Sequence, residues 1–166
     1  MATTRIVINN KPSTPPKTPL EIEAPNSLQK DNKISQSPKP SNPADEQISY
    51  MAAFERVKNK QYDEGIIAMN QFIAHYPNGG YTANAHYWLG ELYLIKQNNV
   101  EAIGQFEAVV NQFPTSGKAA PSLLKFGYAL AAAGRTDEAR QKLQTVIKNY
   151  PDTHSAQLAA EKLKSL

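Results

Sequence analysis

The sequence has 166 residues, a formal net charge of +3 and no cysteine. This small positive excess is too thin to predict nucleic-acid binding, and the missing cysteine excludes disulfides, thiol nucleophiles and cysteine-bound zinc. Eight of the 12 prolines lie in the first 46 residues, whereas all 14 aromatic residues and all 8 glycines lie after that point. Composition therefore divides the chain into a tail and a domain near residue 46.

Residues 1–46 are predicted to be a disordered, linker-like tail rich in proline and lysine. The longest apolar run there is Ile6-Val7-Ile8, too little to offset the conformational entropy lost on ordering. No stretch of 7–15 apolar residues follows a basic start, so no secretory signal is expected in the chain as given. No run of 18 apolar residues occurs either, so direct membrane insertion is not expected.

Residues 47–166 are predicted to be an all-α domain. Apolar residues recur every three or four positions, as in Met51, Phe54 and Val57, which is typical of amphipathic helices. No alternating segments of the kind that form strands are found. The pattern divides the domain into three helix pairs, at residues 47–77, 82–114 and 119–151, followed by a capping helix at 153–166.

A repeat of 37 residues fixes this division. The pairs Tyr76-Pro77, Phe113-Pro114 and Tyr150-Pro151 are each 37 residues apart, and proline there ends the second helix of a pair because it cannot continue it. Three further sets of residues recur at the same 37-residue spacing, and we call each set a column. They predict that the helices cross closely and that large apolar side chains fill the space around each crossing. They are Ala53, Gly90 and Gly127; Gly65, Ala102 and Ala139; and Met69, Phe106 and Leu143.

The starts of the second helices differ between the repeats. Asn99 and Thr136 precede acidic residues and are predicted to be N-caps, whereas the first repeat has Tyr62 at this position. Gly65 also stands where alanine is expected, and a glycine inside a helix costs about 1 kcal/mol. The first helix pair is therefore predicted to be the weakest of the three.

These columns resemble the tetratricopeptide repeat (TPR), whose usual period is about 34 residues. In the second repeat the resemblance runs through Leu89, Gly90, Tyr93, Ala102, Phe106 and Pro114. It implies a right-handed solenoid, and the helix at 153–166 is expected to cover its last apolar face.

The 37-residue variant resembles more closely the C-terminal TPR domain of the CpoB/YbgF family, and the resemblance spans residues 47–166. The uninterrupted stretch Tyr87-Trp88-Leu89-Gly90-Glu91 carries it, together with Tyr76-Pro77, Ser122-Leu123-Leu124-Lys125 and Tyr150-Pro151. The resemblance implies a periplasmic, non-catalytic scaffold of the Tol-Pal cell-division machinery. Its implied partners are TolA and a bifunctional peptidoglycan synthase, and its implied role is to coordinate peptidoglycan synthesis with outer-membrane constriction. Family members carry a signal peptide and a trimerising coiled coil, whereas the chain as given has the linker-like tail, so its oligomeric state is not predicted.

The TPR resemblance also implies a groove lined by the first helix of each pair. The residues expected to line this groove and contact a partner are Tyr50, Phe54, Asn84, Tyr87, Glu91, Leu94, Leu124 and Tyr128. Trp88 is instead assigned to the core. TPR adaptors that clamp a terminal carboxylate use lysine and asparagine at positions where this chain has Tyr50, Phe54 and Trp88, so a carboxylate clamp is not expected. An aromatic groove with one acid favours a segment with some positive charge.

No catalytic, cofactor or metal site is predicted. His75, His86 and His154 are isolated, and His86 is expected to be a packed, hydrogen-bonded imidazole. Ser122 and Lys125 fit the S-x-x-K pattern of penicillin-binding enzymes, but its companion motifs are missing. Two alternatives to the periplasmic scaffold stay open: a cytoplasmic TPR adaptor for an unidentified peptide or protein, and a subunit that self-associates through the groove.

Overall fold

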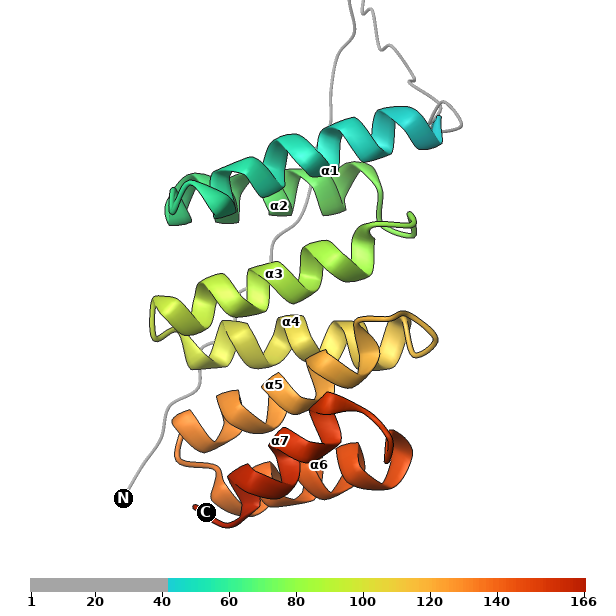
Figure 1. Ribbon diagram of the computed structural model, residues 1–166. Coiled ribbons are helices and arrows are strands. Elements are labelled where there is room, and N and C mark those ends of the chain that lie inside the picture. Colours follow the sequence, from blue (N-terminus) through green and yellow to red (C-terminus); the bar gives the residue numbers. More distant parts are fainter. Residues whose placement is uncertain (1–41) are drawn as a thin grey trace, which may run out of the picture. The chain divides into compact units, whose positions relative to one another are not determined.

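The computed structural model describes residues 42–166, and all seven helices in this part of the chain are α-helices (Figure 1). They are α1 (Pro43–Lys58), α2 (Tyr62–His75), α3 (Thr82–Ile95), α4 (Asn99–Gln112), α5 (Ala119–Ala132), α6 (Thr136–Asn149) and α7 (His154–Leu163). The predicted all-α class, the three helix pairs and the capping helix are confirmed. The disorder predicted for residues 1–41 concerns residues outside the described part.

The helix boundaries follow the 37-residue repeat. α2, α4 and α6 begin at Tyr62, Asn99 and Thr136, and each is followed by an aromatic residue and a proline. Inside each pair the turn is also the same. Lys60, Gln97 and Gly134 all have positive φ, at 59°, 61° and 77°. The N–H groups of these residues donate hydrogen bonds to carbonyls of the preceding helix, in the pattern of a Schellman turn. The positive φ is favourable for glycine, whereas a residue with a side chain is strained there.

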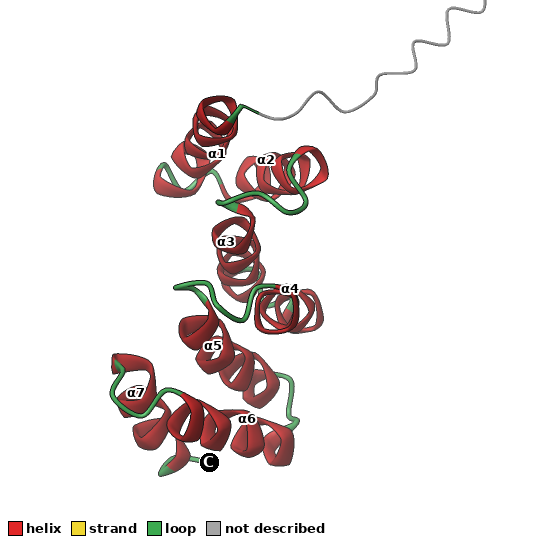
Figure 2. Cartoon of the chain, turned by 90° about the vertical axis from the view of Figure 1, so that its right-hand side faces the viewer, coloured by secondary structure: helices red, strands yellow, loops and turns green. Residues whose placement is uncertain are grey.

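Within residues 42–166 the helices stack in chain order. Figure 2 shows α1, α3, α5 and α7 along one side of the stack and α2, α4 and α6 along the other. Each helix packs against its neighbours in sequence, and α7 also packs against α5. We call the surface formed by α1, α3, α5 and α7 the odd-helix face.

Small residues allow the helices of a pair to cross closely. A Cβ added at Gly90 would lie 2.5 Å from the ring of Phe106, and one at Gly127 would lie 2.8 Å from Leu143. Gly65 differs, because a Cβ there would meet Leu92 at 3.4 Å, an ordinary contact. The large partners at these crossings, Phe106 and Leu143, are fully buried, as the sequence columns predict.

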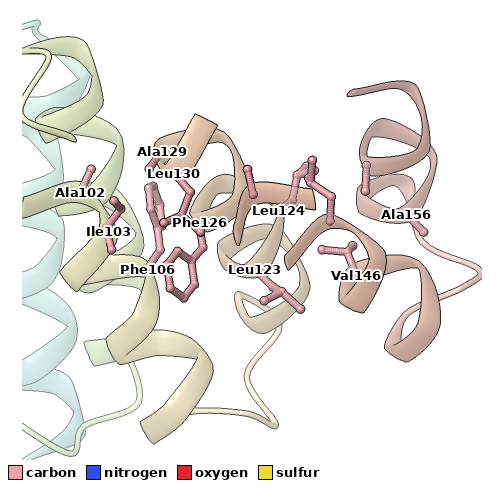
Figure 3. Packing of buried hydrophobic residues seen from close by; sticks show 13 residues of the cluster. Ala102, Ile103, Phe106, Leu123, Leu124, Phe126, Ala129, Leu130, Val146 and Ala156 are labelled. Atoms are coloured by element: carbon pink, nitrogen blue, oxygen red, sulfur yellow. The ribbon is translucent and has the colours of Figure 1, made fainter. Parts of the chain in front are cut away.

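The core of the last two pairs is continuous with the capping helix. Figure 3 shows Ile103 and Phe106 of α4 facing Phe126 and Leu130 of α5, with Leu124, Val146 and Ala156 further along the stack. All of these residues are buried. α7 therefore covers the apolar end of the stack, as expected of a capping helix.

Two details of the sequence prediction were wrong. α1 begins at Pro43 with Asn42 as its N-cap, so residues 43–46, assigned to the tail, belong to the first helix. Proline fits the first position of a helix because its missing N–H is not needed there. Asn99 and Thr136 are not N-caps: each is the first helical residue, and no side chain caps α4 or α6. Asn98 and Arg135 occupy the N-cap positions instead. Their backbone N–H groups bond to the carbonyls of Tyr93 and Leu130 in the preceding helices.

Glu46 was missed because it was assigned to the tail. Its side chain is buried, and its carboxylate accepts a 2.8 Å hydrogen bond from the backbone N–H of Tyr81, immediately before α3. A Cβ at Gly79 would collide with this carboxylate. Glycine at residue 79 thus leaves room for an acid that ties α1 to the start of α3.

Candidate partner-binding surface

The eight residues predicted to line the groove lie on α1, α3 and α5, but their exposure differs. Phe54, Asn84, Tyr87, Glu91, Leu94 and Tyr128 are half-buried on the odd-helix face. Tyr50 and Leu124 are only 7% and 3% exposed and belong to the core. These two therefore support the surface from beneath and offer a partner little area.

Aromatic side chains fill the part of the face formed by α1 and α3. The ring of Tyr50 is covered by Tyr81 at 4.9 Å and stacks on Phe54 at 6.0 Å, which explains its burial. Phe54 in turn contacts Trp88 with ring centroids 5.0 Å apart. Trp88, assigned to the core by the sequence, is half-buried at the edge of this cluster and presents part of its ring to the surface.

Lysines line the part of the face formed by α5 and α7. The ammonium of Lys118 lies 4.5 Å from the ring centre of Tyr87 and 5.8 Å from that of Trp88. Lys125 and Lys162 lie 6.0 and 5.9 Å from the ring centre of Tyr128. The sequence prediction missed all three lysines. For Lys125 and Lys162 the signal was the spacing, since they lie 37 and 74 residues beyond Trp88.

The acid predicted to attract a cationic partner is already paired. Glu91 of α3 forms a 3.0 Å ion pair with Lys125 of α5, and both side chains are largely covered, at 21% and 29% exposure. The other carboxylate oxygen, Oε1, is buried without a hydrogen-bond partner. The sequence-based expectation of a positively charged partner therefore loses its basis, because Glu91 is neutralised within the domain.

The tyrosines of the face stay protonated. Burial, reinforced by the nearby negative charge of Glu91, raises the pKa of Tyr87 to about 12. Burial and the charge of Glu161 also raise the pKa of Tyr128, and burial raises that of Tyr50. The phenols of Tyr87 and Tyr128 can thus act as neutral hydrogen-bond donors near neutral pH, whereas Tyr50 lies beneath the surface.

The histidine and the S-x-x-K pattern considered in the sequence are also located by the structure. The Nδ1–H of His86 donates a 2.8 Å hydrogen bond to Oε1 of Gln105, and burial lowers the pKa of His86. The packed, hydrogen-bonded imidazole predicted from the sequence is therefore confirmed. Ser122 is fully buried with no hydrogen-bond partner for its hydroxyl, while the Lys125 ammonium of the same pattern bonds to Glu91. Within residues 42–166, no cluster of three potential metal ligands occurs, and no helix there is long and apolar enough to cross a membrane.

A cavity of about 340 Å³ lies between α1 and α2. Its walls include Ser49, Ala52 and Arg56 of α1 with Gln71 and His75 of α2. The sequence prediction gave no hint of it.

Comparison with known families agrees with this architecture. Two sequence models, each described as a tetratricopeptide repeat, match residues 50–117 and residues 122–153. The chain carries a tetratricopeptide-repeat domain. Solved TPR domains share the fold at low sequence identity. The second TPR domain of human RPAP3, in complex with an HSP70 peptide, has a TM-score of 0.60 at 22% identity and covers 74% of this chain and 98% of its own.

Two further TPR structures are similar to the same degree. The first TPR of Spaghetti (RPAP3), bound to an HSP90 peptide, has a TM-score of 0.62 at 15% identity, with coverage of 75% of this chain and 94% of its own. The Arabidopsis OM64 TPR domain has a TM-score of 0.59 at 16% identity, with coverage of 75% and 98%. At such identities these structures support the TPR fold alone.

Curated relatives support the resemblance to CpoB. Two proteins from Pseudomonas putida, both named cell division coordinator CpoB, are each 47% identical to this chain over 60 residues. The matched stretch is 36% of this chain and 22% of the relative's length. The predicted likeness of this TPR domain to the CpoB family is therefore confirmed, while the chain aligns with only about a fifth of each relative.

Proposed function

We propose that this chain is the partner-binding TPR domain of a CpoB-type cell-division coordinator. In this role it is a non-catalytic periplasmic scaffold that binds TolA, contacts a bifunctional peptidoglycan synthase and helps to coordinate cell-wall synthesis with constriction of the outer membrane. The observation that carries the proposal is the 47% identity to CpoB over 60 residues of this chain.

The odd-helix face supports a binding role. It presents half-buried aromatic side chains, which are enriched in protein interfaces, with lysines and one acid beside them. Met51, which is 44% exposed, adds an apolar contact on α1. It lies 37 residues before Trp88 and therefore occupies the equivalent position of the first pair.

Calorimetric titration of the purified chain with TolA tests the proposal. We expect binding at tens of micromolar, and Met51→Ser should weaken it about fivefold because an exposed apolar contact is lost from the interface. The matched control is Ile67→Ser, which removes an exposed apolar side chain from α2 instead and should change the affinity less than twofold. Heat changes indistinguishable from dilution at these concentrations would reject TolA as the partner.

Location is tested separately. Fractionation of cells that express the native gene should recover the protein with the periplasm. Recovery with the cytoplasm would contradict the periplasmic assignment and favour the alternative, a cytoplasmic TPR adaptor.

A further inference from the structure

We propose that the odd-helix face binds a partner segment that is apolar at one end and acidic at the other. Its apolar end lies over α1 and α3, and its side-chain carboxylates lie over the lysines of α5 and α7. This inference rests on the proposed function and refines it, because it names the chemistry of the partner at the same surface.

One column of equivalent positions changes from apolar to cationic along the stack. Residues 37 apart on successive odd helices are Met51, Trp88, Lys125 and Lys162. The first two are partly exposed apolar side chains, and the ammonium groups of the last two both lie about 6 Å from the ring centre of Tyr128. A segment that crosses all four helices therefore meets an apolar surface first and a basic one afterwards.

Two of the lysines have no carboxylate partner within the domain. Among residues 42–166, no acid lies within ion-pair distance of Lys118 or Lys162, whose ammonium groups instead lie over aromatic rings. A cation over a ring is held only weakly when it is exposed, and each ammonium carries three donors. Both can therefore turn toward a carboxylate of a partner without breaking an ion pair.

The acids of the face do not cancel this charge. Glu91 is neutralised by Lys125, and its second oxygen is buried out of reach of a partner. Glu161 is exposed on α7, where its charge contributes to the raised pKa of Tyr128. At the α5–α7 end, Lys118, Lys125 and Lys162 thus stand against Glu91 and Glu161, of which Glu91 is already paired. At the α1 end, Lys58 lies 5.9 Å from the ring centre of Phe54 but is paired with Glu55 of the same helix.

The experiment uses synthetic peptides that differ only in charge. Each peptide joins an apolar block of leucine, valine and tyrosine to four glutamates, four lysines or four glutamines, and each is made with the charged block at either end. All are acetylated and amidated, so that no terminal carboxylate takes part. Binding to the full chain is followed by calorimetry and by the fluorescence of Trp88, which is the chain's single tryptophan.

We expect one acidic peptide to bind at least tenfold more tightly than its lysine counterpart, with an affinity that falls as salt is added. The double variant Lys118→Gln/Lys162→Gln should lose about tenfold. Its matched control, Arg140→Gln/Lys148→Gln, removes two exposed charges from α6 and should lose less than twofold. Equal or better binding of the basic peptide, equal losses in the two double variants, or no binding of any peptide at millimolar concentration would each overturn the inference.

TolA titrated against the same variants separates this inference from the proposed function. If TolA binds and the Lys118→Gln/Lys162→Gln variant binds it equally well, the acidic-segment inference fails and the proposed function stands. If TolA does not bind but an acidic peptide does, the assignment of TolA fails and the inference stands.

Discussion

The first and third helix pairs differ on one side of their first helix. In the second and third pairs, this side packs against the preceding pair. The side chains on this side are apolar and covered in the second and third pairs, whereas in the first pair they are small or charged and exposed. Two columns of equivalent positions show the change: Ala52, Leu89 and Phe126, and Arg56, Tyr93 and Leu130. Leu89 and Phe126 are buried in core clusters, while Ala52 and Arg56 line the cavity between α1 and α2.

The comparison shows how one repeat is adapted to end a stack. The helix backbone and the 37-residue spacing are kept, but the side chains that would bury a neighbouring pair are replaced. At the other end α7 covers the apolar surface instead. Solenoids require such capping because every internal repeat has an apolar face on both sides.

The largest effect should come from removing the apolar side chain that distinguishes the third pair. Phe126→Ala deletes a buried ring between α4 and α5 and should lower the free energy of unfolding by about 3–5 kcal/mol. Ala52→Leu, at the equivalent position of the first pair, should change it by less than about 0.5 kcal/mol. Urea unfolding followed by circular dichroism measures both. Equal losses would show that the two surfaces do not differ as described.

Alanine substitutions at Gly90 and Gly65 test a further difference between the helix pairs. Gly90→Ala places a methyl group against the Phe106 ring and should destabilise the domain by about 1–3 kcal/mol. Gly65→Ala finds ordinary contact distances and should stabilise it by about 1 kcal/mol, since alanine is the better helix former. The two free energies, measured by the same urea unfolding, should have opposite signs. Destabilisation by Gly65→Ala would contradict the packing at this crossing.

The hydrogen bond between Glu46 and Tyr81, which joins the first two helix pairs, can be removed by substitution at Glu46. Glu46→Ala removes the acceptor for the Tyr81 N–H and should destabilise the α1–α3 contact by about 1 kcal/mol, because a partly buried donor loses its acceptor. Hydrogen exchange of α1 and α2 should speed up more than that of α5 and α6. Glu46→Gln retains an acceptor and serves as the control. Uniform acceleration across all helices would mean that this bond does not act locally.

The smallest effect concerns pH. Burial lowers the pKa of His86, an effect only partly offset by its hydrogen bond to Gln105. Below about pH 6.5 the unfolded chain therefore takes up a proton that the folded chain resists, so stability should fall as the pH drops through this value. His86→Gln should flatten this dependence, whereas His154→Gln, at an exposed position on α7, is the matched control. Thermal unfolding between pH 7 and pH 5 measures how stability depends on pH. If His86→Gln left this dependence unchanged, His86 would not be its source.

The sequence predicted the fold well because the repeat spacing reports helix packing directly. The spacing of Tyr76, Phe113 and Tyr150 located the ends of α2, α4 and α6 to within two residues. The start of α1 was misplaced because Pro43 was grouped with the prolines of the tail. Proline has opposite meanings inside a linker and at the first position of a helix.

The candidate surface was predicted less completely, because spacing gives the side of a helix and not the depth of a side chain. Tyr50 is buried by the ring of Tyr81, which the connection between α2 and α3 supplies. Leu124 belongs to the core cluster that α7 completes. The Glu91–Lys125 pair joins two helices, and its effect on the charge of the face appears only when both are placed.

The central claim is that this TPR domain binds its partner through the odd-helix face. Chemical-shift mapping of the isotope-labelled chain titrated with TolA tests it most directly. We predict perturbations concentrated on α1, α3, α5 and α7, with the indole N–H of Trp88 among the largest. Perturbations concentrated on α2, α4 and α6, or none at tens of micromolar, would contradict the account.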